Sequence, residues 1–395
     1  MKKLVALLMT VLLLNVFAGC SQADEIPDDP NQYVYSYDDS SAGGAVENTF
    51  DWSALIDEKL DMSVLSLDAK IESADLFSND FAKQLLVLSS AQTADDFSEM
   101  FTAAGFTVVK QGNFDKADDD ISHTCAYTLA KRTIAIGGVN RMLYVIAVRG
   151  TYGGEWYSNF DFAPSHTDNG AFAENFLFAA EDVLIGIKDY VDISENPFIV
   201  ATGYSRGAAC ANILSLLLDS IYGGASVSGY SFATPPTYRD GIEKEYKNIF
   251  VINNKADLVP YLPLRQWGYR SVGTEIWLDA DPDGVEKAGE TAEMLYSVAP
   301  SVISYYNDRH SLTSSGLSDE GITAYELMLT VCAAARNGNF GFGNSTGKAD
   351  IISDASDFAP LAEQFSEWSK NGGSGFGEIV KQHMPTTYQK LLNGR

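Results

Sequence analysis

The sequence predicts a globular protein of the α/β class, and three observations support that class. The chain has 395 residues, of which 46% are hydrophobic and 12% aromatic, a composition typical of a domain with a large core. In its middle part, segments with helical apolar spacing alternate with short, continuously apolar runs that are typical of buried strands. Beyond residue 278 the apolar spacing is mainly helical. Alternating helices and buried strands predict a parallel or mixed sheet covered by helices on both faces.

A helical region and a hairpin are the first predicted elements of this domain. Apolar spacing is mostly helical over residues 79–109 and gives way near Thr107 to shorter runs suited to strands. Residues 127–136 and 141–148 then flank the sequence Gly-Gly-Val-Asn at 137–140. Two strand-like runs around such a sequence predict a hairpin.

A helix, a strand and a second helix are predicted next. Residues 171–190 have the spacing of a long amphipathic helix, which ends before Pro197. Residues 198–203 are apolar throughout and short, as expected of a buried strand, and residues 206–220 return to helical spacing. Further strands are expected at 226–232 and 248–253.

The last part of the chain is predicted to be a mainly helical insertion, residues 279–380, followed by a short final helix after Pro385. Clusters of Gly, Asn and Ser separate the helical segments within the insertion. These segments are 288–306, 320–335 and 358–368.

Residues 1–20 have the pattern of an export signal. A pair of lysines precedes an apolar stretch at residues 4–17, and Gly19-Cys20 follows. Gly19-Cys20 resembles the bacterial lipoprotein signal, in which the cysteine becomes the lipidated first residue after cleavage. Phe17 departs from the aliphatic residue usual at its place, so ordinary secretion remains the alternative. We expect export, with anchoring to the membrane at the cell surface through Cys20.

Residues 21–50 are expected to be a solvated tether, because they are acidic, rich in Pro, Gly and Ser, and lack an apolar period. As a flexible coil such a segment reaches roughly 30 Å. A lipid on Cys20 would then hold the globular domain, residues 51–395, close to a membrane. The formal net charge of −26 argues against nucleic acid as a partner and against flat docking on anionic lipid.

The cysteines indicate neither a disulfide scaffold nor a metal site. With Cys20 used for lipid, Cys125, Cys210 and Cys332 remain, and none forms a C-x-x-C pair. That set allows one disulfide and argues against zinc. We expect the protein to need no metal and no cofactor, and composition leaves the oligomeric state open.

A pattern of the form G-x-S-x-G stands within "FIVATGYSRGAAC", residues 198–210. The pattern alone is weak, so the context must decide. A nucleophile needs a strand that ends in a tight turn and enters a helix at once, because this raises the serine Oγ above the sheet and aims helix N–H groups at the substrate. Here an apolar run precedes Ser205, Gly203 and Gly207 leave room for the turn, and a helical segment follows. Ser205 is therefore predicted to be a nucleophile, and a serine that merely caps the helix is the alternative.

A serine nucleophile needs a histidine as base and a carboxylate to orient that histidine, in the chain order Ser, Asp, His for this type of turn. Asp257 stands in "NIFVINNKADLVPYLP", just past a predicted strand, where a loop at the carboxyl edge of the sheet is expected. His123 and His166 precede Ser205, so chain order excludes both. His310 and His383 remain as candidate bases.

At this point the stretch from about residue 81 to 278 resembles the class 3 lipase family of α/β-hydrolases, especially its bacterial, exported members. The motifs that carry the resemblance are "VRGT" at 148–151, the turn at 203–207, "YSFATPP" at 230–236 and "ADLVPYLP" at 256–263. The resemblance implies the α/β-hydrolase fold, with a mostly parallel central sheet, and cleavage of carboxylic esters of acyl lipids through an acyl-enzyme.

The resemblance also implies roles for particular residues. Thr151 and Arg206 would each give a backbone N–H to the oxyanion hole, and the glycine-hinged, aromatic stretch 152–162 lies where such lipases carry a lid. Ordinary core packing is an equal alternative for that stretch. Arg206 replaces the leucine common in lipases, which puts the substrate preference in doubt.

The two candidate bases correspond to different features of the family. His310 lies at a short distance after the strand that ends near residue 278, as in fungal lipases, whereas "QHMPTTYQKLL" around His383 is similar to the last motif of the bacterial members. We predict His383 as the base and keep His310 as the alternative. The helical insertion would then lie between the acid and the base.

Other functions remain open on this scaffold, because one fold hosts many activities. A thioesterase or a peptidase would use the same triad. A membrane-tethered binding protein without enzymatic activity would keep the turn and lack a competent triad. Neither the acyl chain length nor the head group of a lipid substrate follows from the sequence.

Overall fold

The computed structural model describes residues 59–115, 124–151, 164–167, 170–261, 268–280 and 381–395, with residues 282 and 285 between them. All of these except Lys381 belong to one compact unit. The expected signal, the expected tether and nearly all of the expected insertion lie outside the described residues. None of the helices in the described ranges is long and apolar enough to cross a membrane.

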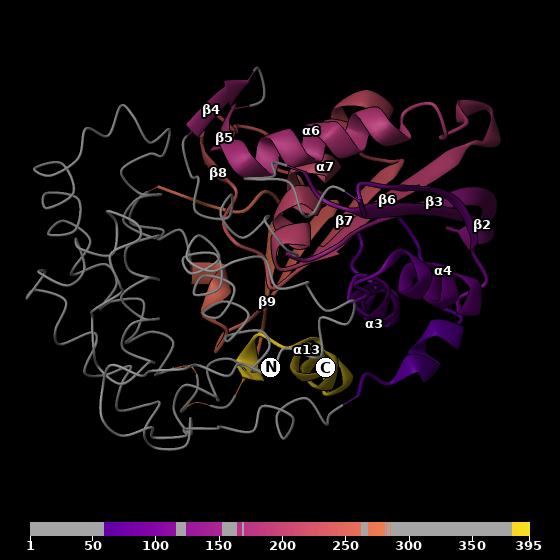
Figure 1. Cartoon of the computed structure of the whole chain (residues 1–395), viewed down its shortest axis with the longest axis horizontal. Coiled ribbons are helices and arrows are strands. Elements are labelled where there is room, and N and C mark those ends of the chain that lie inside the picture. Colours follow the sequence, from indigo (N-terminus) through magenta and orange to yellow (C-terminus); the bar gives the residue numbers. More distant parts are fainter. Residues whose placement is uncertain are drawn as a thin grey trace, which may run out of the picture. The chain divides into compact units, whose positions relative to one another are not determined.

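A seven-stranded sheet forms the centre of this unit, in the order β1-β2-β3-β6-β7-β9-β10 (Figure 1). The β1–β2 and β2–β3 pairs are antiparallel, and every pairing from β3 to β10 is parallel. The predicted α/β class with a mostly parallel sheet is therefore confirmed. The strands are β1 (Thr107–Gly112), β2 (Tyr127–Ile136), β3 (Val139–Val148), β6 (Pro197–Tyr204), β7 (Val227–Phe232), β9 (Ile249–Asn254) and β10 (Thr274–Leu278).

Helices cover both faces of the sheet, as predicted. On one face α7 packs against β6 and β7, and α6 packs against α7; α3, α4 and α13 lie on the other (Figure 1). Alternate strand residues such as Phe198 and Val200 enter the same apolar cluster as α3 and α13, because successive side chains of a strand point to opposite faces. The helices are α3 (Asn79–Leu88), α4 (Ala94–Ala103), α6 (Glu174–Ile187), α7 (Arg206–Tyr222) and α13 (Pro385–Asn393).

The hairpin between β2 and β3 is tighter than the sequence suggested. The ladder closes with Ile136 opposite Val139, so only Gly137 and Gly138 form the turn. Their φ angles are 55° and 79°. A two-residue turn of this kind needs a positive φ at both positions, which glycine adopts without steric cost. The second strand therefore begins two residues earlier than its predicted start.

The predicted helix at 171–190 is wrong at its beginning. The segment opens with a short strand, β5 (Gly170–Ala173), which pairs with β4 (Pro164–Thr167) and β8 (Tyr238–Asp240) in a second, three-stranded sheet. Three consecutive residues of β5 are fully buried, and pairing with β8 satisfies their backbone. Tertiary burial thus overrides the helical spacing, which is followed only from Glu174 onward.

The final helix, α13, brings the end of the chain back to the beginning of the described domain. It starts with Pro385 at its first turn, the position where a missing N–H costs nothing. Asn79 Nδ2 donates to the carbonyl of Leu392 at 3.1 Å, and the Gln389 amide exchanges two hydrogen bonds with the backbone of Asp61, at 2.7 and 3.0 Å. These contacts hold α13, and with it the segment that contains His383, against α3 and the residues that precede it.

Candidate active site

The turn that carries Ser205 joins β6 to α7. β6 ends at Tyr204 and α7 begins at Arg206, so Ser205 alone makes the change of direction. Its φ of 56° and ψ of −123° are strained for a residue with a Cβ, and surrounding contacts must hold them. The Ser205 N–H donates to the carbonyl of Phe232 at 3.0 Å, and the Ser205 carbonyl accepts from the N–H of Ala208 at 2.9 Å. This strand-turn-helix arrangement is what a nucleophile elbow requires.

Gly203 and Gly207 occupy the two places in the turn that leave no room for a side chain. A Cβ at Gly203 would lie 2.1 Å from the carbonyl oxygen of Gly207. A Cβ at Gly207 would lie 2.3 Å from the carbonyl oxygen of Val148. Both obstacles are backbone atoms, which cannot rotate away. Gly203 therefore lets the start of α7 lie directly against the end of β6, and Gly207 lets it lie directly against the end of β3.

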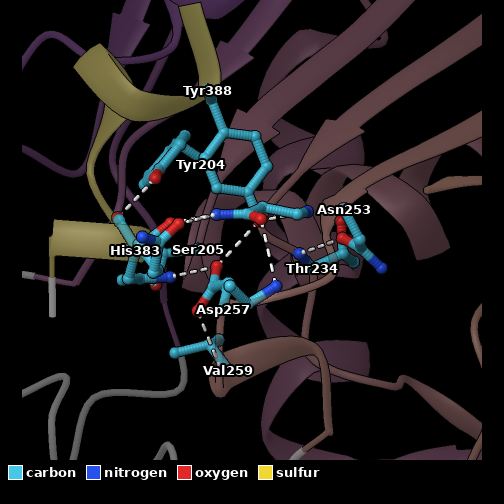
Figure 2. Close-up of polar contacts among 11 residues, drawn as sticks. Tyr204, Ser205, Thr234, Asn253, Asp257, Val259, His383 and Tyr388 are labelled. Atoms are coloured by element: carbon cyan, nitrogen blue, oxygen red, sulfur yellow. Dashed lines mark hydrogen bonds and ion pairs between the residues drawn. The ribbon is translucent and has the colours of Figure 1, made fainter. Parts of the chain in front are cut away.

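His383 lies between Ser205 and Asp257 (Figure 2). Its Nε2 is 3.0 Å from Ser205 Oγ, and its Nδ1 is 2.7 Å from Asp257 Oδ2. Asp257 follows the end of β9 and is fully buried, whereas His383 is 2% exposed and precedes α13. One imidazole nitrogen therefore faces the hydroxyl and the other faces the carboxylate. These are the contacts of a Ser-His-Asp triad.

Of the three other histidines, the structure describes only His166. His166 lies in β4, in the second sheet, opposite Ala171. His123 and the alternative base His310 lie outside the described residues. The structure brings His383 to Ser205 and Asp257.

The carboxylate of Asp257 is held from three sides. Oδ1 accepts from the backbone N–H of Val259 at 3.0 Å, and Oδ2 accepts from the Tyr388 hydroxyl at 2.7 Å besides facing His383 Nδ1 (Figure 2). The Tyr388 hydroxyl in turn accepts from the backbone N–H of Asn254 at 3.0 Å. Its only proton is therefore directed at Asp257. These bonds fix the plane of the carboxylate against which the imidazole is oriented.

Tyr388 stays a hydrogen-bond donor over the whole range in which enzymes work. Burial, and next the negative charge of Asp257, raise the pKa of the Tyr388 phenol well above its ordinary value. A phenolate beside a buried carboxylate would be doubly unfavourable, because burial penalises charge and the two charges repel. The sequence reading did not assign Tyr388 a role.

Tyr204 holds the backbone of His383. Its hydroxyl donates to the His383 carbonyl at 2.5 Å, and its ring centroid lies 5.5 Å from that of His383 (Figure 2). Asn254 Nδ2 donates to the carbonyl of the preceding residue, Gln382, at 2.9 Å. The loop that presents the imidazole is therefore fixed on both sides of the ring. The sequence did not indicate this role for Tyr204 either, because an aromatic residue at the end of a buried strand is usually a core residue.

The two segments with the predicted oxyanion donors lie against each other. A Cβ on Gly150, the residue before Thr151, would lie 3.3 Å from the carbonyl oxygen of Tyr204. Arg206 is the first residue of α7, so its N–H belongs to the end of the helix that carries the positive pole of the dipole. The candidate lid, residues 152–162, lies outside the described residues.

The side chain of Arg206 turns away from solvent and is 1% exposed. Its guanidinium donates to the carbonyl of Thr124 at 3.3 Å and lies 5.7 Å from the ring centroid of Phe176 on α6. The Arg206 side chain is therefore part of the packing between α7 and α6. Within the described ranges, no group of three or more His, Cys, Asp and Glu side chains is placed to hold a metal ion.

Fold and site together define the class: a mostly parallel sheet with a serine elbow, a buried aspartate and a histidine between them is an α/β-hydrolase arrangement. Within that class, residues 145–267 match the family described as Lipase (class 3). The matched segment contains Ser205 and Asp257 and ends before His310 and His383. This part of the chain is therefore similar to class 3 lipases.

Two curated fungal proteins are similar to part of the chain. A secreted mono- and diacylglycerol lipase A of Penicillium cyclopium is 29% identical over 189 residues, which are 45% of this chain and 57% of that protein. A secreted mono- and diacylglycerol lipase 1 of Fusarium solani is 32% identical over 154 residues, 35% of this chain and 44% of that one. The chain therefore spans about half the length of the curated relatives it matches.

Solved structures also align with it. A crystal structure of a mutant form of MDLA from Penicillium cyclopium aligns with 24% identity and a TM-score of 0.38, over 51% of this chain and 78% of that one. A triacylglycerol lipase whose catalytic centre is described as a serine protease triad aligns with 17% identity and a TM-score of 0.39, over 51% and 80%.

Proposed function

We propose that the chain is a serine hydrolase that cleaves carboxylic esters of acyl lipids. The observation that carries the proposal is the position of His383, with one ring nitrogen at 3.0 Å from Ser205 Oγ and the other at 2.7 Å from Asp257 Oδ2. A serine hydroxyl is a poor nucleophile until a base takes its proton, and this contact supplies the base. The class 3 lipase match over residues 145–267 supports a lipid ester as the substrate.

The reaction follows from these contacts. His383 Nε2 removes the Ser205 proton while Oγ attacks the ester carbonyl, and the imidazolium so formed keeps its Nδ1–H on Asp257. The negative oxygen of the tetrahedral intermediate is stabilised by the backbone N–H groups of Thr151 and Arg206. His383 then gives its proton to the leaving alcohol. A water molecule repeats the sequence on the acyl-enzyme, releases the fatty acid and restores Ser205.

The competing functions differ in what they predict for the site. A binding protein without activity has no need for a base in contact with the serine hydroxyl, and the contact between Ser205 and His383 therefore favours an enzyme. A thioesterase or a peptidase would use the same three residues. The distinction between them rests on the substrate and is made by experiment.

The test combines active-site labelling with a substrate panel. Wild-type protein should be labelled by a fluorophosphonate and should hydrolyse p-nitrophenyl and glycerol esters of graded chain length faster than matched thioesters and anilides. Ser205→Ala should lose the label while keeping its melting temperature, because the alanine removes only Oγ. Ser194→Ala is the matched control and should label like wild type. Ser194 is exposed and lies before the start of β6, whereas Ser205 follows the end of that strand. Equal labelling of the Ser205 and Ser194 variants would refute the serine mechanism.

We further propose that the protein is an exported lipoprotein of the bacterial type, anchored through Cys20. The lysines, the apolar stretch and Gly19-Cys20 support this proposal. Both curated relatives are named as secreted, which supports export. With the acidic segment 21–50 as a tether, the hydrolase would stand near a membrane and remain free to turn.

Cys20→Ala should block lipidation, because the acyl group is attached through that sulfur. We expect wild-type protein to partition into the detergent phase of a Triton X-114 separation and the variant to appear in the aqueous phase or as unprocessed precursor. Ser21→Ala is the control and should partition as wild type does. Equal detergent partitioning of wild type and of Cys20→Ala protein that has lost its signal would remove the lipoprotein proposal and leave the hydrolase proposal untouched.

A further inference from the structure

We propose that Cys125 and Cys210 form a disulfide bond in the exported protein. Their Sγ atoms lie 3.0 Å apart, although 85 residues separate them in the sequence. Both side chains are fully buried. The structure holds them as two thiols in contact. This covalent bond would join the segment before β2 to α7, the helix that follows Ser205.

The geometry requires little movement. A disulfide has a sulfur–sulfur distance of about 2.0 Å, so the two atoms need to approach by only about 1 Å. Cys125 stands just before β2, and Cys210 lies near the start of α7. The contact is therefore made between a buried segment that leads into β2 and a helix that packs on the sheet, not between exposed loops. In an oxidising compartment, a buried thiol pair that is already in contact is the expected substrate of disulfide formation.

The surroundings of Cys125 give the bond a role. The carbonyl of Thr124 accepts from the guanidinium of Arg206 at 3.3 Å, and the carbonyl of Ala126 accepts from the backbone N–H of Arg149 at 2.9 Å. Residues 124–126 therefore contact both the start of α7 and the segment that leads to Thr151. A bond from Cys125 to Cys210 would fix α7 to this strand. It would thus hold together the two segments to which we assign the oxyanion hole.

The chemistry is a two-electron oxidation by thiol–disulfide exchange. The thiolate of one cysteine attacks a sulfur of a disulfide oxidant, such as oxidised glutathione or an oxidoreductase, and displaces one thiolate. The second cysteine then attacks the mixed disulfide, forms the Cys125–Cys210 bond and displaces the other half of the oxidant. Both electrons pass to the oxidant, which becomes two thiols. Because the native sulfurs are buried, the exchange takes place during folding.

The enclosed loop predicts a large effect on stability. The bond would close a loop that contains Thr151 and Ser205, and a cross-link over so many residues removes much conformational freedom from the unfolded chain. We expect oxidation to raise the melting temperature by roughly 5–15 °C. The sulfurs lie outside the hydrogen bonds of the triad, so kcat/KM at moderate temperature should change less than about threefold.

The direct test counts thiols in the full chain after export through its own signal. The protein is denatured without reductant, alkylated with light iodoacetamide, then reduced and alkylated with heavy iodoacetamide. We expect heavy label on Cys125 and Cys210 and light label on Cys332, which serves as the internal control. Light label on Cys125 and Cys210 would overturn the proposal, and so would a disulfide from either of them to Cys332. The measurement does not use activity, so it stands apart from the proposed hydrolase function.

A second test uses stability and does not depend on one variant folding well. Dithiothreitol should lower the melting temperature of wild type and of Cys332→Ala by the same amount. It should leave the melting temperatures of Cys125→Ala and Cys210→Ala unchanged, because neither variant can form the bond. A full reductant effect in Cys125→Ala would overturn the proposal. If neither alanine variant folds, the labelling of wild type still decides.

Discussion

Replacing His383 with alanine should abolish ester hydrolysis to the same extent as replacing Ser205, with kcat lowered by about 10⁴–10⁶-fold. The reason is that Nε2, at 3.0 Å from Ser205 Oγ, is the group placed to take the hydroxyl proton. Residues that act as one catalytic unit lose nearly the whole effect when any of them is removed. The measurement is kcat/KM on a short-chain p-nitrophenyl ester, together with the rate of fluorophosphonate labelling.

His310→Ala is the matched control, because His310 is the other histidine that follows Asp257 in the chain. We expect it to retain most of the wild-type activity. The fold of His383→Ala should survive, since Tyr204 bonds to the backbone carbonyl of that residue and not to its ring. Melting temperatures of both variants check this. Full activity in His383→Ala together with loss in His310→Ala would move the base to His310 and make the contacts of His383 structural.

The elbow could be predicted from sequence because its determinants are local. An apolar run, a glycine on each side of Ser205 and a helical segment follow one another within residues 198–210. The structure shows why the glycines are needed, since a Cβ at either position would meet a backbone oxygen at 2.1 or 2.3 Å. The role of Asp257 could be predicted from the sequence for a similar reason. It follows a buried strand directly, and parallel strands deliver such residues to one edge of the sheet.

His383 could not be assigned from spacing, because 126 residues separate it from Asp257. Only the resemblance of its flanking motif favoured it over His310. The strand β5 was missed for a related reason: its residues follow helical spacing, and pairing with β8 decides their conformation. Tyr204 and Tyr388 were missed because a buried tyrosine reads as core. Their roles depend on where two hydroxyls point after α13 has docked, which no local pattern encodes.

The second large effect is expected from Asp257→Asn, which should lower kcat by about 10⁴-fold while the protein stays folded, with a loss of stability of about 1–3 kcal/mol because the amide nitrogen cannot accept the Tyr388 proton. The carboxylate accepts from Val259, Tyr388 and His383, and the asparagine keeps the shape of the side chain while losing the charge. An amide nitrogen facing His383 Nδ1 favours the tautomer that carries its proton on Nε2. That imidazole cannot accept the proton of Ser205, so the base is lost.

Tyr388→Phe separates positioning from catalysis in the same network. The phenylalanine removes the bond to Asp257 and the bond from the Asn254 N–H and leaves the fold of α13, so we expect a loss of about tenfold in kcat with KM nearly unchanged. The double variant with Asp257→Asn gives the sharper result. If Tyr388 acts through the carboxylate, its replacement should add less than about twofold once Asp257 is asparagine, because the orientation it supports no longer serves the reaction. Fully additive losses in the logarithm of kcat/KM would show that Tyr388 acts on His383 or the substrate by another route.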